Sequence, residues 1–134
     1  MKRLVTAFGL VCAVGASGCS EQPAAPRSVT LSAQLAHAGS TDRAMLVQLD
    51  GADTSAHIDS VLAPAGPGYR LFTQRQSLTA WRAIVTGNLS DGVLLQLVVP
   101  GRSQASAYRA TILDVADASF ASVPPGVRAV TIAR

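Results

Sequence analysis

The chain has 134 residues, 49% of them hydrophobic and 4% aromatic, a length that fits one domain and excludes two. Lys2 and Arg3 are two of its eleven basic residues, and without them nine basic residues stand against eight acidic ones. A balance so close to neutral lacks the basic stripe that nucleic acid binding requires, so we expect no nucleic acid partner.

The first eighteen residues have the layout of an export signal. Lys2 and Arg3 precede a run of apolar or small residues that extends from Leu4 to Gly18. This run is shorter than the roughly 20 apolar residues that a transmembrane helix needs. We therefore expect residues 1–18 to be a cleaved signal peptide rather than a retained anchor.

The end of this segment, Ala16-Ser17-Gly18-Cys19, resembles the lipobox of bacterial lipoproteins, in which small residues precede an invariant cysteine. The family usually has leucine at the position of Ala16. Residues 16–18 also resemble an ordinary signal peptidase site, which leaves a plainly secreted protein as the alternative. The resemblance implies a diacylglyceryl thioether on the Cys19 sulfur and a further acyl chain, such as palmitate, on its new α-amino group. Several acyl chains would anchor the domain to a membrane.

The residues around Cys19 extend this expectation to localisation. Ser20 stands where an aspartate would imply retention at the inner membrane, so the resemblance implies a lipid-anchored, extracytoplasmic protein of the cell envelope, at the outer membrane if the cell has two. Cys12 would leave with the signal and Cys19 would carry lipid, so the folded domain has no thiol for a disulfide, a zinc site or a nucleophile. Residues 19–27 contain two prolines and no apolar period, and we expect a flexible tether there.

Residues 28–134 are expected to form one domain. Short runs rich in β-branched and aromatic residues alternate there with Gly, Pro, Asn and Asp turns, which predicts an all-β fold, an antiparallel sandwich of about seven to nine strands. The expected strands are Val29 to Leu35, Ala44 to Leu49, His57 to Leu62, Tyr69 to Thr73, Leu78 to Thr86, Val93 to Val99, Tyr108 to Val115 and Val127 to Ala133. One helical turn is expected at residues 116–121.

Alternation along these strands predicts which side chains are buried. The expected inward sets are Val29, Leu31, Ala33 and Leu35 in the first strand, and Val93, Leu95, Leu97 and Val99 in the sixth. In the run from Ala44 to Leu49 both faces are largely apolar. That strand is either central and covered on both sides, or part of a sheet with a hydrophobic outer face, which would be a binding surface.

From Ala44 to Val99 the order of features resembles the cohesin domain and related carbohydrate-binding sandwiches. An apolar strand reaches Asp50-Gly51, Ile58-Asp59-Ser60-Val61 leads into Ala63-Pro64, and Gly87-Asn88-Leu89-Ser90-Asp91-Gly92-Val93-Leu94-Leu95 opens a long apolar strand. The resemblance implies an immunoglobulin-like or cohesin-like sandwich used in recognition. It carries over no partner-binding residue, because the surface by which cohesins grip dockerin modules does not align with this chain.

Motifs of catalysis and metal binding are missing from the sequence. His37 and His57 lack the spacing of a zinc site, and no serine stands in a Gly-x-Ser-x-Gly elbow. Asp50, Asp53 and Asp59 are the only carboxylate cluster, and aspartate-rich turns of this kind are usually solvated. We expect no catalytic residue, no metal and no cofactor.

The candidate ligand contacts are aromatic and arginine residues of the predicted strands. Aromatic rings stack on sugars and guanidinium groups donate hydrogen bonds beside them. The candidates are Tyr69, Arg70, Trp81, Arg82 and Tyr108. The alternation around Trp81 favours a core position, which leaves the two tyrosines as aromatic candidates.

Together these observations predict a non-catalytic, membrane-anchored lipoprotein that binds or scaffolds an envelope protein or polysaccharide. One alternative is a structural accessory lipoprotein of an envelope or secretion assembly, docked through an exposed sheet edge. The other is an envelope hydrolase, because convergent catalytic triads need no fixed motif.

Overall fold

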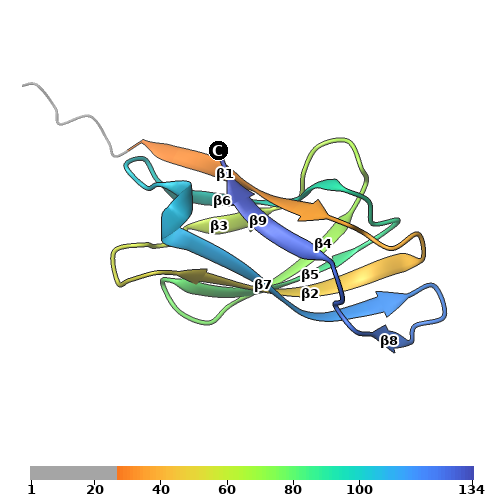
Figure 1. Cartoon of the computed structure of the whole chain (residues 1–134). Coiled ribbons are helices and arrows are strands. Elements are labelled where there is room, and N and C mark those ends of the chain that lie inside the picture. Colours follow the sequence, from red (N-terminus) through yellow and green to blue (C-terminus); the bar gives the residue numbers. More distant parts are fainter. Residues whose placement is uncertain (1–26) are drawn as a thin grey trace, which may run out of the picture.

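The computed structural model describes residues 27–134, so the predicted signal, Cys19 and almost all of the predicted tether lie outside the described residues. The described chain forms nine strands and one short 3-10 helix, arranged as two antiparallel sheets packed face to face (Figure 1). These elements are β1 (Ser28–Ala36), β2 (Asp42–Gly51), β3 (Ser60–Leu62), β4 (Arg70–Arg75), β5 (Ala80–Thr86), β6 (Gly92–Pro100), η1 (Ala105–Ala107), β7 (Tyr108–Asp117), β8 (Ser122–Val123) and β9 (Ala129–Ala133). The predicted antiparallel β-sandwich is confirmed.

The two sheets have the strand orders β3-β6-β1-β9 and β4-β5-β2-β7-β8. In Figure 1 the start of β1 and η1 lie at one end of the sandwich, at the left. The β1–β2 turn and the β7–β8 hairpin lie at the other end. We call the first of these the N-terminal end. Among residues 27–134 no helix has the length and hydropathy needed to cross a bilayer.

The core follows the alternation predicted for β1, except that Val29 at its start is only half-buried, and in β2 it takes one of the two faces that the sequence left undecided. Leu31, Ala33 and Leu35 of β1 are buried, and so are Met45, Val47 and Leu49 of β2. The twenty buried hydrophobic residues form one cluster between the sheets. Because one face of each strand supplies this cluster, the other face of the five-stranded sheet is left to solvent within the described chain.

The alternation predicted for β6 is wrong at its start. Ala33 pairs with Leu95 but Gln34 pairs with Val93, so Leu94 is an extra residue in the ladder. This β-bulge turns Leu94 and Leu95 both into the core and leaves Val93 only half-buried.

The helical turn predicted at residues 116–121 is also wrong. The strand β7 continues to Asp117, and the short strand β8 returns beside it, which the sequence did not predict. The Asp117 carboxylate accepts hydrogen bonds from the N–H groups of Ser119 and Ala121, and Phe120 has φ = 62°. These bonds close a tight reversal in place of a helix, because an aspartate side chain competes with helical backbone pairing.

A buried ion pair joins the two sheets. Asp42 is fully buried and accepts bonds from Arg128 Nε at 2.6 Å and Nη2 at 2.8 Å, and from the Gly39 N–H at 2.7 Å. Arg128 also donates to the carbonyl oxygens of Pro124 and Pro125. The guanidinium lowers the pKa of Asp42 below its ordinary value, and the carboxylate raises the pKa of Arg128.

Candidate functional site

The three aromatic candidates belong to the core. Tyr69 and Tyr108 are 8% and 6% exposed, and Trp81 packs partly buried against the same cluster. The Tyr108 hydroxyl donates to the His57 carbonyl oxygen at 2.9 Å, and the Trp81 indole N–H donates to the Ile58 carbonyl oxygen at 3.1 Å. Their polar atoms therefore hold loops in place, and little of either tyrosine ring remains for stacking on a ligand.

The two arginine candidates lie on the outer face of the five-stranded sheet. Arg70 begins β4 and pairs with Thr86, while Arg82 in β5 pairs with Gln74 of β4 and with Gln48 of β2. Both side chains are exposed. The structure therefore brings the two arginines to one surface and separates them from the aromatic candidates.

An apolar row crosses the middle of this outer face. Phe72 of β4 pairs with Ile84 of β5, Ile84 pairs with Leu46 of β2, and Leu46 pairs with Asp114 of β7. Phe72 is 58% exposed and Ile84 is 42% exposed. We call Phe72, Ile84 and Leu46 the apolar row; it shows that β2 has a hydrophobic outer face, one of the two alternatives that its sequence allowed.

A polar row runs beside the apolar row, one step nearer the N-terminal end. It consists of Gln74, Arg82 and Gln48, which are cross-strand neighbours. Arg82 Nε donates to Gln48 Oε1 at 3.1 Å, and Gln48 Nε2 donates to Gln76 Oε1 at 2.8 Å and to Asp50 Oδ1 at 3.0 Å. These bonds hold planar amide and guanidinium groups in fixed positions next to exposed hydrocarbon.

Two shallow hollows flank the contact between Leu46 and Ile84. The first, of about 290 Å³, lies on the β4 side and is lined by Phe72, Gln74 and Arg82 as well. The second, of about 180 Å³, lies on the β7 side and is bordered by Ala44, Ala116 and Asp114. No histidine, cysteine or serine lines either hollow, and their linings combine hydrocarbon with amide, guanidinium and carboxylate groups.

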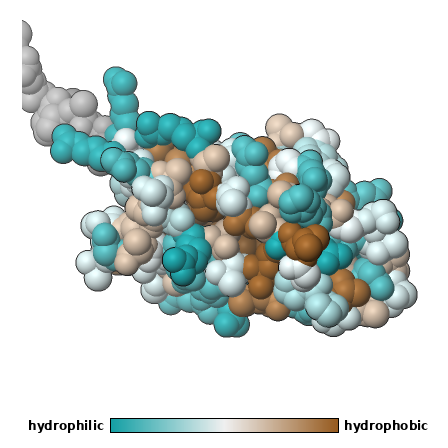
Figure 2. Space-filling view, viewed as in Figure 1, coloured by the Kyte–Doolittle hydropathy of each residue, from teal (hydrophilic) through white to brown (hydrophobic). Residues whose placement is uncertain are grey.

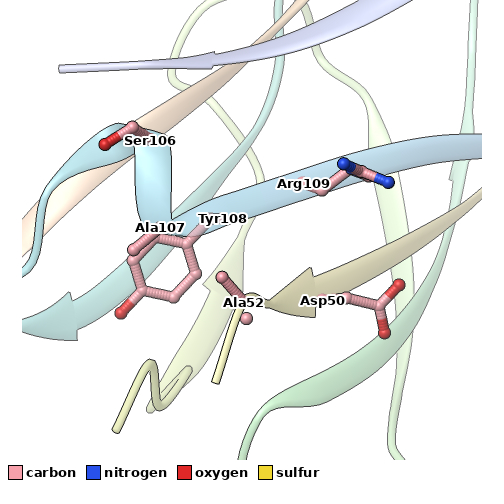
Figure 3. Close-up of a pocket in the computed structure, with 7 residues that line it drawn as sticks. Asp50, Ala52, Ser106, Ala107, Tyr108 and Arg109 are labelled. Atoms are coloured by element: carbon pink, nitrogen blue, oxygen red, sulfur yellow. The ribbon is translucent and has the colours of Figure 1, made fainter.

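A third hollow, of about 310 Å³, lies at the N-terminal end between the end of β2 and the start of β7. Asp50 and Arg109 are cross-strand partners there, and Figure 3 shows both side chains projecting to one side while the ring of Tyr108 points to the other. Ala52, Ser106 and Ala107 complete the lining. Small side chains and backbone dominate this hollow, which offers one carboxylate and one guanidinium.

The acidic turn contains no metal cluster within the described residues, where no three His, Cys, Asp or Glu side chains come together. The Asp53 carboxylate instead accepts bonds from the Ser55 hydroxyl and N–H and from the Ala56 N–H, which lower its pKa. His57 leads into β3, and His37 lies after β1 with φ = 60°. Neither histidine lines the three hollows described above.

Comparisons with protein-family models, with curated proteins and with solved structures found no match for this chain. The lipobox and cohesin resemblances therefore stay predictions from the sequence.

Sequence reasoning overlooked Phe72 and Ile84 as surface residues. The signal was present, because alternation in the run from Tyr69 to Thr73 puts Arg70 and Phe72 on one face and Tyr69 and Leu71 on the other. The pairing of Phe72 with Ile84 and Leu46, which makes a row of them, depends on strand order and has no trace in the sequence.

Proposed function

We propose that this protein is a lipid-anchored, extracytoplasmic binding or scaffolding module without catalytic activity. Its anchor would be lipid on Cys19, and its partner would be a protein or polysaccharide of the cell envelope. The observation that carries the binding half of this proposal is the outer face of the five-stranded sheet, where the apolar row lies beside fixed amide and guanidinium groups.

The physical argument rests on what this face exposes. Monomeric domains rarely leave a contiguous set of large apolar side chains in water unless something covers them. Two exposed members of the row, Phe72 and Ile84, are adjacent on neighbouring strands, and the ordered Gln48 and Arg82 beside them supply directional hydrogen bonds. Such a surface recognises a partner without performing chemistry on it.

Intact mass spectrometry tests the anchor. The full chain is expressed in a bacterium, purified from detergent-solubilised membranes and compared with a Cys19→Ala variant. We expect a chain that starts at Cys19 and carries acyl mass, and we expect the variant to leave the membrane fraction. An unmodified chain cut at another small residue would contradict the anchor.

Binding to isolated envelope fractions tests the face. Cell-wall polysaccharide and solubilised envelope protein are each titrated with the wild type, a Phe72→Ser/Ile84→Ser variant and a Phe120→Ser control. Phe120 is 90% exposed but lies in the β7–β8 hairpin, away from the apolar row. Binding that the face variant loses and the control keeps supports the proposal, whereas equal binding by all three argues against it.

A second candidate, an accessory lipoprotein docked through a sheet edge, is favoured by β9. This strand, Ala129-Val130-Thr131-Ile132-Ala133, is an edge of the four-stranded sheet and has no charge, Pro or Gly. Figure 2 shows hydrophobic residues gathered in the middle of the view, where β9 and β7 border the open side of the sandwich. Edges of this kind usually carry a charge or a cover, and an uncharged one can accept an added strand.

Co-purification from membranes tests this candidate. A Thr131→Lys substitution puts a charge on the edge and should release an envelope complex bound there, while Thr54→Lys in an exposed loop should retain it. Recovery of the same complex with both variants would rule out docking through β9.

A further inference from the structure

We propose that the outer face of the five-stranded sheet is an interface between two copies of this chain, related by a twofold axis that runs along the strands. The inference deepens the proposed function by naming the partner that the apolar row contacts, and it rests in part on the predicted lipid anchor. Three features of the face lead to it: its distribution of charge, its two hollows and the direction in which the chain enters the domain.

The β4 side of this face is positive, whereas the β7 side carries Asp114 and, nearer the N-terminal end, Arg109 beside its cross-strand partner Asp50. Arg70 and Arg82 lie towards the β4 edge, and Asp114 lies at the β7 end of the row that Phe72 begins. Three strand spacings and two residues along the strands separate Arg70 from Asp114 of the same copy, so the two are about 16 Å apart and too distant to pair. A twofold axis along the strands lays β4 of one copy over β7 of the other and brings each arginine side towards the facing carboxylate.

The hollows fit the same arrangement. With the axis between Leu46 and Ile84, these two residues lie over their counterparts, Ile84 and Leu46 of the second copy. Phe72, the most exposed member of the apolar row, then faces the β7 side of the second copy at the level of Asp114, at the border of the hollow that Ala44 and Ala116 also line. Small residues leave room there for the Phe72 ring, and Arg70, two residues earlier in β4, lies opposite Ala116 and within side-chain reach of Asp114.

The direction in which the chain enters the domain favours a twofold axis along the strands over one across them. A twofold axis along the strands keeps the N-terminal ends of both copies at the same end of the dimer, whereas an axis across the strands puts them at opposite ends. The segment between Cys19 and Ser28 has eight residues, which span at most about 28 Å. Two copies with lipid on Cys19 in one membrane therefore meet most directly in the first dimer, in which both tethers leave from the same end.

The small area of the face predicts a weakly associating dimer. Four strands spaced by about 4.8 Å, over about seven residues each, cover roughly 450 Å² per copy. The total of about 900 Å² is below the range of stable specific interfaces and within that of weak, transient ones, so we expect a dissociation constant of about 10–300 µM in solution. Anchoring both copies in one membrane raises their local concentration and favours the dimer there.

Sedimentation velocity of the mature chain with Cys19→Ala, from about 10 µM to about 1 mM, measures the dimer without lipid. We expect concentration-dependent dimerisation in the wild type and in the Phe120→Ser control. The Phe72→Ser/Ile84→Ser variant, checked for folding by circular dichroism, should stay monomeric. A chain that is monomeric over the whole range overturns the proposal.

Charge exchange then tests the orientation. Arg70→Asp puts a carboxylate near Asp114 of the second copy and should weaken the dimer by at least about tenfold. Adding Asp114→Arg in the same chain restores opposite charges across the interface and should recover most of the loss. Since the two positions are too distant to pair within one copy, a double variant as weak as Arg70→Asp alone would overturn this arrangement.

These outcomes are independent of the anchor experiment. The chain could carry lipid on Cys19, stay monomeric, and bind polysaccharide or lipid vesicles through its apolar row. That result would overturn the dimer and assign the face to that ligand; the vesicles contain about 80% phosphatidylethanolamine and about 20% phosphatidylglycerol. A dimer formed by a chain without lipid would uphold the interface and remove only the argument from the shared membrane.

Discussion

Single residues contribute most to stability where a charge is buried, and here that residue is Asp42. Its carboxylate accepts two hydrogen bonds from Arg128 and one from the Gly39 backbone, with none of its surface exposed. Removing one partner of a buried ion pair leaves the other uncompensated, which typically costs about 3–5 kcal/mol. Gly39 is part of the arrangement, because a Cβ there would lie 2.6 Å from Arg128 Nη2.

We predict that Asp42→Asn lowers the free energy of unfolding by about 3 kcal/mol, towards the low end because Arg128 keeps some contact with water. Urea denaturation followed by Trp81 fluorescence measures the change. Asp59→Asn is the control, since Asp59 is exposed and its substitution should stay within about 0.5 kcal/mol of the wild type. Equal losses in the two variants would show that the ion pair does not stabilise the fold.

The same pair predicts how stability depends on pH. Hydrogen bonding to Arg128 lowers the pKa of Asp42 in the folded state, while the unfolded chain has an ordinary value of about 3.9. A lowered folded pKa contributes stability that is complete above the unfolded pKa and disappears as the pH falls through the folded pKa. The difference in unfolding free energy between the wild type and Asp42→Asn should therefore be full at about pH 7 and shrink below about pH 4.

Urea titrations at a series of pH values check this expectation. The pKa values of Asp53 and Asp117 are lowered by hydrogen bonds in their turns, but both proteins retain these groups, so their effect cancels in the difference. A difference that stays constant down to about pH 2.5 would mean that Asp42 gains nothing from its charge.

At the scale of elements, the β7–β8 hairpin is held together by its turn rather than by its strands. The strand β8 has two residues, and the reversal depends on the hydrogen bonds of Asp117 and on the left-handed backbone of Phe120. The left-handed conformation raises the free energy of a residue that has a Cβ, whereas glycine adopts it without that cost. The Phe120 ring is 90% exposed and offsets little of this cost by packing.

Phe120→Gly should therefore raise the free energy of unfolding by about 0.5–1 kcal/mol relative to Phe120→Ala. The alanine variant is the matched control, because it removes the same ring and keeps the Cβ. Chemical denaturation of both variants gives the difference. If the two are equally stable, the left-handed conformation at this position carries no strain.

Element boundaries also show how far alternation and turn residues can be used for prediction. Eight of the strands were expected near their observed positions, because hydrophobic period and Gly, Pro, Asn and Asp punctuation are local properties of the sequence. The errors at Leu94 and at residues 116–121 have different causes. The bulge at Leu94 depends on how β6 pairs with β1, which no local pattern records, whereas the reversal after Asp117 is a local competition of its side chain with helical pairing.

At the scale of the whole molecule, one hydrophobic cluster holds the two sheets together, and pairs distant in sequence close it. Ser32 near the start pairs with Ala133 near the end, and Asp42 bonds Arg128 across 86 positions. No cysteine lies in residues 28–134, so no disulfide assists this closure. The domain depends on noncovalent contacts alone, chiefly its one core, and should unfold as a unit.

We accordingly predict one cooperative thermal transition for the mature chain with Cys19→Ala, with a midpoint that a reducing agent leaves unchanged. Calorimetry with and without dithiothreitol measures both, with the calorimetric and van't Hoff enthalpies compared. Two separate transitions would show that the sheets unfold independently despite their shared core.

The sequence by itself determined the β class, the approximate strands and the inward face of β1, because alternation and turn chemistry act between neighbouring residues. It also carried the predicted anchor at Cys19, which lies outside the described residues. Only the tertiary structure decided which exposed residues form a surface. Strand order placed Phe72, Ile84 and Leu46 in one row and buried Tyr69 and Tyr108, because contacts across a sheet join segments that the chain itself keeps far apart.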